Sequence, residues 1–99
     1  MEPAVLYVDD EAPNLDVFRR CLDEQFRVLT AASGPAALDL LKKENVGVLI
    51  SDQKMDPMTG IELLSRAQSE HPLVTRMLLT AFSDRELLLA AIQRGKVEE

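Results

Sequence analysis

Four short runs rich in apolar or β-favouring residues divide the chain, and acidic or small residues follow each of them. The first run, at 4–8, is apolar at every position, which is typical of a parallel strand buried on both faces. The second, at 26–31, mixes polar with β-favouring residues and indicates a strand nearer the sheet edge. We expect strands at 4–8, 26–31, 46–50 and 74–79.

Between these runs, apolar residues recur at spacings of three and four, the period of an amphipathic helix. The first helix should begin near Pro13, and the sequence SGP at 33–35 should open the second. A pattern that resembles a capping box, at 83–86, precedes the last helix, which Gly95 should close. We expect four helices, marked by Leu15, Phe18 and Leu22, by Ala37, Leu38 and Leu41, by Ile61, Leu64 and Ala67, and by the run 87–94.

The alternation of strands and helices predicts an α/β fold, a doubly wound parallel sheet with helices on both faces. Short connections and right-handed crossovers favour a flavodoxin-like sheet with the strand order 2-1-3-4. In such a sheet the chemistry lies at the carboxyl ends of the strands, near the point where the strand order reverses. Ninety-nine residues leave room for one hydrophobic core, so we expect a single domain over 1–99.

The charge and hydropathy of the chain disfavour several partners. Seventeen acidic side chains against eleven basic ones give a net charge of −6, which would repel the phosphate backbone of a nucleic acid. The apolar runs are far shorter than the roughly 20 residues that cross a membrane. The start of the chain, MEP, also lacks the basic segment of a signal peptide. We therefore expect a cytoplasmic protein that binds neither nucleic acid nor membrane.

Three aspartates follow two strands that should be neighbours. Asp9 and Asp10 come directly after the first strand and Asp52 follows the third, so all three should meet at one edge of the sheet. Crowded carboxylates repel one another unless a cation relieves them, and their hard oxygens favour Mg²⁺. Beside such an ion a carboxylate can attack a phosphorus atom. Asp52 is the candidate nucleophile, and Thr80, after the fourth strand, is placed to offer its hydroxyl to a phosphoryl oxygen.

Four motifs, in their order and spacing, resemble the bacterial response regulator receiver family over the whole chain: VDDE at 8–11, SDQKM at 51–55, MTG at 58–60 and LTA at 79–81. The resemblance implies that Asp9, Asp10 and Asp52 surround a Mg²⁺ ion, directly or through water. The backbone carbonyl of Lys54 would complete the metal shell. The resemblance also implies that Asp52 accepts a phosphoryl group from a histidine kinase and that Thr80 is the switch hydroxyl. The chain would then be a phosphoacceptor of a two-component system and not an enzyme.

The sequence departs from the family pattern in two places. The proline expected four residues after Asp52 is Asp56 here, followed by Pro57. The larger departure is that no fifth strand with its lysine follows the last helix, and Lys54 and Lys96 are better explained as solvated side chains than as substitutes. Loss of that lysine should impair both catalysis and switching. We expect a truncated receiver, natural or engineered, that either forms a homodimer through its exposed sheet or rearranges its last helix to cover it.

The residues leave other functions open. A receiver-like dimerisation or assembly module without phosphorylation would explain the missing lysine. An Asp-dependent phosphohydrolase also uses a carboxylate and Mg²⁺, but it usually has a second acid two residues after its nucleophile, where Lys54 stands. A nucleotide-binding fold is disfavoured because the acidic sequence DDEAP at 9–13 takes the place of a glycine-rich loop.

Overall fold

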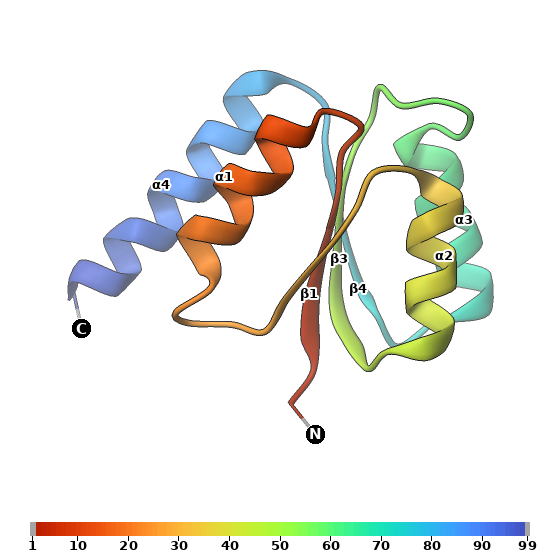
Figure 1. Ribbon diagram of the computed structural model, residues 1–99, viewed down its shortest axis with the longest axis horizontal. Coiled ribbons are helices and arrows are strands. Elements are labelled where there is room, and N and C mark those ends of the chain that lie inside the picture. The colour runs from red at the N-terminus through yellow and green to blue at the C-terminus, as the bar shows by residue number, and fades with distance from the viewer. Residues whose placement is uncertain (1, 99) are drawn as a thin grey trace.

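The strands of the sheet are all parallel and lie in the order β2-β1-β3-β4 (Figure 1). In this computed structural model the backbone is described for residues 2–98, and the side chains for the same residues except 82 and 92–98. The strands are β1 (Ala4–Val8), β2 (Val28–Ala31), β3 (Val46–Asp52) and β4 (Thr75–Leu79). The fold class and the strand order predicted from the sequence are confirmed. β1 lies inside the sheet and all of its residues are buried, which explains its unbroken apolar sequence.

The helices form two layers, one on each face of the sheet. α1 (Ala12–Leu22) and α4 (Phe82–Glu98) lie side by side on one face, while α2 (Gly34–Lys43) and α3 (Gly60–Glu70) cover the other (Figure 1). The strand order reverses between β1 and β3, because the chain moves outward from β1 to β2 in one direction and from β3 to β4 in the other. No helix of the described residues is long and apolar enough to cross a membrane.

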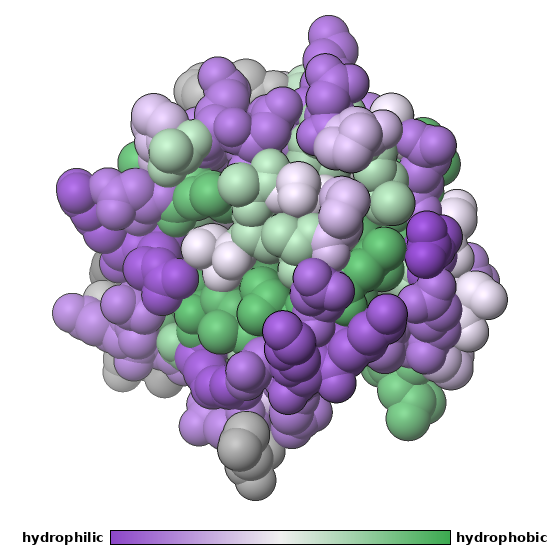
Figure 2. Space-filling model, turned by 45° about the vertical axis from the view of Figure 1, so that its right-hand side comes forward, coloured by the Kyte–Doolittle hydropathy of each residue, from purple (hydrophilic) through white to green (hydrophobic). Residues whose placement is uncertain are grey.

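The sheet separates two apolar clusters, because alternate residues of β1 point to opposite faces. Leu6 and Val8 pack toward the α2–α3 layer, where Leu63 is fully buried. Tyr7 packs toward the α1–α4 layer, where its ring stacks on Phe18 with the centroids 4.1 Å apart. Figure 2, turned so that the α2–α3 side comes forward, shows apolar surface near its centre with polar side chains around it. The cluster on the α2–α3 face of β1 is therefore aliphatic, whereas the cluster on the α1–α4 face also contains the stacked rings of Tyr7 and Phe18.

α4 covers the face of the sheet beside α1. Its Leu89 is buried in the same cluster as Tyr7, Phe18 and Leu79, and its backbone runs along α1 and β4. Of the two arrangements expected from the sequence, a last helix rearranged to cover the sheet is the one that the structure has. Self-association stays a prediction. The outer edge of β4 has no strand beside it among residues 2–98.

Local signals fix where several elements begin. The Ser33 hydroxyl accepts a backbone hydrogen bond at the start of α2, and Thr59 and Glu62 form a reciprocal capping box at the start of α3, with distances of 3.2 and 2.9 Å. The strand expected from 26 is wrong at its start, because β2 begins at Val28. Phe26 belongs to the turn before it, with 43% of its surface exposed.

The boundaries of α4 also differ from those expected. The helix begins at residue 82, so the capping box expected at 83–86 is wrong. Instead, the Asp84 carboxylate accepts hydrogen bonds from the backbone N–H groups of Thr80 and Ala81, at 2.9 and 3.1 Å. Gly95 does not close the helix, which continues to residue 98. The single acid at 84 thus ties the end of β4 to the first turn of α4.

Candidate functional site

The carboxyl ends of β1 and β3 bring three aspartates together. Val8 pairs with Ser51 across the two strands, so Asp9 and Asp52, the residues that follow them, lie at the same edge of the sheet. Carboxylate oxygens of Asp9, Asp10 and Asp52 all lie within 4.8 Å of one another. Asp9 is fully buried, Asp52 is half-buried and Asp10 is exposed. The acidic cluster therefore reaches from the core of the protein to solvent.

Hydrogen-bond donors surround the buried carboxylate of Asp9. The Tyr7 hydroxyl donates to its Oδ2 at 2.7 Å, and the side-chain amide of Asn14 donates to the same oxygen at 3.0 Å. The backbone N–H of Glu11 donates to Oδ1 at 3.0 Å. Nη2 of Arg85 lies 3.4 Å from Oδ2 in an ion pair that is almost completely buried. These donors offset the cost of burying the Asp9 carboxylate.

Arg85 is a residue of the site that the sequence alone does not single out. It lies near the start of α4 with 7% of its surface exposed, and its Nε donates to the Tyr7 hydroxyl at 3.0 Å. Lys54 is exposed, and the side chain of Lys96 lies outside those that the structure describes. The available signal was a basic residue five positions after Thr80, ahead of an apolar run. The position of α4 beside α1 is what brings Arg85 to Tyr7 and Asp9.

Burial and neighbouring charge shift the pKa of two groups in the site. The pKa of Asp52 is raised above its ordinary value of 3.8, first by burial and then by the negative charge of Asp9, while Arg85 opposes the shift. The pKa of the Tyr7 hydroxyl is also raised, first by burial and then by its hydrogen bond to Asp9. Asp52 is therefore a more basic carboxylate than usual, and Tyr7 stays protonated and donates to Asp9.

Asp52 faces an open hollow of about 580 Å³. The walls come from the end of β3, from the segments that follow β1, β3 and β4, and from the start of α4. Since one water molecule takes up about 30 Å³, the hollow has room for a hydrated ion and a phosphoryl group. It is lined by Asp10, Glu11, Asp52, Lys54, Thr80, Ala81 and Arg85. The candidate residues predicted from the sequence thus line one space, apart from the buried Asp9.

Backbone contacts hold the loop that follows Asp52. The N–H of Gln53 donates to the carbonyl of Leu79 at 3.1 Å, and its carbonyl accepts from the N–H of Gly60 at 3.0 Å. A Cβ atom on Gly60 would lie 2.3 Å from the backbone oxygen of Asp52, so glycine is needed where α3 begins against β3. Asp56, the acid in place of the expected proline, is exposed in this loop as a turn residue would be.

Thr80 follows β4 directly, and the preceding Leu79 pairs with Asp52. The Thr80 hydroxyl donates to Oδ2 of Asp84 at 3.0 Å, and its backbone N–H donates to the same oxygen at 2.9 Å. These hydrogen bonds hold the pKa of the Asp84 carboxyl below its usual range. The hydroxyl therefore lies at the hollow but is bonded to α4, and it must turn away from Asp84 to meet any group on Asp52.

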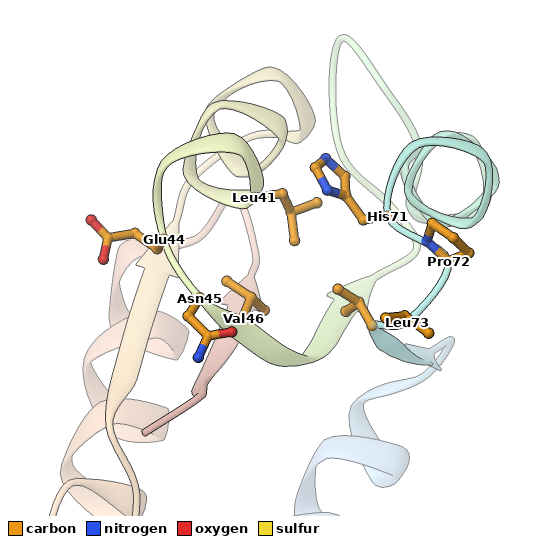
Figure 3. A pocket seen from close by; sticks show the side chains of 8 residues that line it. Leu41, Glu44, Asn45, Val46, His71, Pro72 and Leu73 are labelled. Carbon is orange, nitrogen blue, oxygen red and sulfur yellow. The ribbon is translucent and has the colours of Figure 1, made fainter. Parts of the chain in front are cut away.

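A second groove, of about 310 Å³, lies at the opposite end of the sheet. Figure 3 shows its lining, which comes from the end of α2, the start of β3 and the connection from α3 to β4. Leu73 is 97% exposed there, and His71 is half-buried at the end of α3. None of the three clustered aspartates belongs to this lining. The aspartate cluster therefore lies at the carboxyl edge of the sheet, away from this groove.

Comparisons with known proteins agree over nearly the whole chain. The family model described as "Response regulator receiver domain" matches residues 5–98. Over 97% of its length the chain is 36% identical to the hydrogenase transcriptional regulatory protein HoxA of Cupriavidus necator, and over 92% it is 36% identical to the transcriptional regulatory protein GlrR of Escherichia coli. The chain spans about a fifth of the length of these two relatives.

A solved structure shares the fold as well. The crystal structure of the signal receiver domain of an HD domain-containing protein from Pseudomonas fluorescens matches with a TM-score of 0.79 and 31% sequence identity. The match covers 97% of this chain and 78% of that one. The sequence motifs and the backbone thus point to the same group of proteins.

Proposed function

The chain belongs to the response regulator receiver family, and from this premise we propose that Asp52 accepts a phosphoryl group from a histidine kinase in a Mg²⁺-dependent step. The observation that carries the proposal is the position of Asp52, in the wall of an open hollow beside two other aspartates. In this role the chain is a stoichiometric phosphoacceptor in a two-component system and not an enzyme.

The surroundings of the three aspartates favour Asp52 as the acceptor. Asp9 is fully buried and its carboxylate is already bonded to several donors. Asp10 is exposed, so its carboxylate keeps most of its hydration. Asp52 combines access to the hollow with a raised pKa, and a more basic carboxylate is a better nucleophile.

The donor set of the cluster fits Mg²⁺. Two oxygens on opposite sides of a Mg²⁺ ion lie about 4.2 Å apart, and the carboxylate oxygens here lie within 4.8 Å of one another. Small rotations of the exposed and half-buried side chains would close the difference. Asp9, Asp10 and Asp52 would hold the ion directly or through water, with the backbone carbonyl of Lys54 as a further ligand. When bound, the ion neutralises charge on the phosphoryl oxygens.

The transfer itself exchanges one bond for another. A carboxylate oxygen of Asp52 forms a bond to phosphorus while the bond from phosphorus to the donor's histidine nitrogen breaks. The electron pair of the broken bond stays on that nitrogen, which takes up a proton. Thr80 would then leave Asp84 and donate its hydroxyl to a phosphoryl oxygen, which loosens the tie between β4 and α4.

Intact-mass spectrometry tests this proposal. The chain is incubated with Mg²⁺ and acetyl phosphate, a small phosphodonor, and we expect it to gain the mass of one phosphoryl group. Asp52→Asn should abolish the gain. Asp56→Asn removes an exposed acid of the neighbouring loop and should label like the wild type. A wild-type chain that gains no mass, or an Asp52→Asn chain that still does, would contradict the proposal.

A homodimer is the second role that we propose, either together with phosphorylation or as an assembly module without it. The outer edge of β4 is unpaired within the described residues, and Met77 on this strand is 38% exposed. Unpaired strand edges favour pairing with another chain, and two-fold closure is the simplest assembly. Light scattering checks the role: a dimeric mass supports it, and a monomer at micromolar concentration contradicts it.

We further propose that the chain lies in the cytoplasm and that it contacts proteins but neither nucleic acid nor membrane. Its net charge of −6 opposes binding to phosphate-rich surfaces. Histidine kinases take their phosphoryl groups from ATP, and a cytoplasmic location supplies that donor. Electrophoretic mobility of labelled DNA in the presence of the chain should stay unchanged, and a shifted band would contradict this part.

A further inference from the structure

We infer that Arg85 is the phosphoryl-binding cation of this site and that it transmits the state of Asp52 to α4. The inference rests on the proposed function, since it concerns the group that Asp52 would carry. Its basis is the position of the guanidinium, which is 7% exposed, lines the same hollow as Asp52 and forms an ion pair with Asp9.

The site needs a cation more after phosphorylation than before it. Three carboxylates already share the cluster, and a phosphoryl group adds further negative charge in place of one of them. Arg85 is close enough to Asp52 to oppose the rise in the pKa of that carboxyl. Its planar guanidinium offers parallel N–H groups, which match the oxygens of a phosphoryl group.

The present contacts of Arg85 suit a side chain that changes partners. Its Nη2 lies 3.4 Å from Asp9 Oδ2, whereas a strong charge-assisted hydrogen bond is about 2.7–2.9 Å long. Its Nε is held more firmly by the Tyr7 hydroxyl, at 3.0 Å, and Tyr7 is fixed by stacking on Phe18. The guanidinium can therefore pivot about the Tyr7 contact and carry its terminal nitrogens from Asp9 toward Asp52.

Two adjacent residues of α4, Asp84 and Arg85, connect this helix to the site. Arg85 contacts Asp9 and Tyr7, while Asp84 holds the hydroxyl and the backbone of Thr80. Phosphorylation would draw both Arg85 and Thr80 toward Asp52, so both ties at the start of α4 change together. α4 is thus the element that reports phosphorylation in this chain.

Arg85 should also lower the affinity of the unphosphorylated chain for Mg²⁺, because the guanidinium and the ion are both attracted to the Asp9 carboxylate. Removing the guanidinium should therefore strengthen Mg²⁺ binding to the unphosphorylated chain by about three- to tenfold, as expected for two like charges in a partly buried site. The same removal should lower the rate of phosphoryl transfer to Asp52 by tenfold or more. If Arg85 merely shaped the site, its removal would lower both the Mg²⁺ affinity and the rate of phosphoryl transfer.

The test compares Arg85→Gln, Arg85→Lys and the matched control Arg66→Gln, whose exposed side chain pairs with Glu70 on α3. Calorimetry gives the Kd for Mg²⁺, and intact mass gives the labelling rate with acetyl phosphate at saturating Mg²⁺. We expect Arg85→Gln to bind Mg²⁺ more tightly and label more slowly, Arg85→Lys to recover part of the labelling rate, and Arg66→Gln to match the wild type.

Two results separate this inference from the proposed function. If the wild type never labels, the proposed function and the inference both fail. If the wild type labels and a folded Arg85→Gln labels at the same rate, or loses Mg²⁺ affinity with its labelling, only the inference fails. Should Arg85→Gln not fold, the NMR signal of the Arg85 Nε–H in the wild type decides: it should shift on phosphorylation more than that of Arg66, and an equal shift overturns the inference.

Discussion

The two helix layers pack on the same sheet with different chemistry. The α2–α3 layer contributes an aliphatic cluster that includes Leu6, Val8 and Leu63. The α1–α4 layer contains a buried polar chain, in which Arg85 contacts Tyr7 and both contact Asp9. A layer held by apolar burial depends little on pH or ions, whereas one that contains paired charges depends on both. Both layers bury an apolar cluster against the sheet, but only the α1–α4 layer connects the sheet to the acidic site.

The largest effect should come from a cavity in the α2–α3 layer. Leu63 is fully buried against the sheet, so Leu63→Ala should lower the free energy of unfolding by about 3 kcal/mol. Because no charged group lies in this cluster, the loss should be the same with and without Mg²⁺. Urea denaturation checks both statements, and a loss that Mg²⁺ repairs would break the contrast between the layers.

A smaller loss, which Mg²⁺ should reduce, is expected in the α1–α4 layer. Tyr7→Phe keeps the stacked ring but removes the hydroxyl that donates to Asp9 and accepts from Arg85. The loss should be about 1–2 kcal/mol in the absence of metal. Mg²⁺ near Asp9 should restore part of it, because the ion supplies positive charge to the same carboxylate. Parallel urea curves with chelator and with Mg²⁺ provide the measurement, and equal losses in both would contradict the account.

A pH dependence should arise from Asp52. Its pKa in the folded chain is raised above the ordinary 3.8, so the folded state binds the proton more tightly than the unfolded state. Without metal, the contribution of Asp52 to stability should therefore decline as pH rises from 3.8 to the raised pKa, and stay constant above it. Asp52→Asn should remove this decline. Urea midpoints measured across that range give the slope, and identical slopes for both proteins would show the interpretation to be wrong.

The smallest effect is expected at the start of α4. Asp84→Ala removes the acceptor for the hydroxyl and backbone of Thr80, so the melting temperature should fall slightly. Because the pKa of Asp84 is lowered in the folded chain, its contribution is present at neutral pH and is lost as pH falls through that lowered pKa. Thermal melts at neutral and acidic pH should thus differ between wild type and variant only at the higher pH.

The sequence predicts the buried face of α2 better than that of α3 or α4. On α3, the expected Ile61 is 55% exposed and Leu63 is buried in its place. Ser33 and Thr59 are local caps, and the periodic leucines of α2 leave one choice of face. In α4, by contrast, the residues at 87–92 are all apolar, so the sequence does not indicate which side should be buried. The face is chosen by where uncovered apolar surface remains beside α1, which is a property of the whole sheet.

The residues of the candidate site also differ in how well the sequence predicts them. The meeting of Asp9, Asp10 and Asp52 follows from strand order alone, because parallel strands bring their carboxyl ends to one edge. Strand order does not assign Arg85 to the site, since the position of Arg85 depends on the face of the sheet that α4 covers. The hydrogen bond between Thr80 and Asp84 likewise depends on where α4 begins, one residue before the expected capping box.

Locating the phosphoryl group on the chain tests directly whether Asp52 is the acceptor. After incubation with Mg²⁺ and acetyl phosphate, borohydride reduces an aspartyl phosphate to homoserine, which tandem mass spectrometry places in the sequence. We expect homoserine at position 52 and unchanged aspartate at positions 9 and 10. Homoserine at either of those positions, or at none of the three in a chain that binds Mg²⁺, would contradict this expectation.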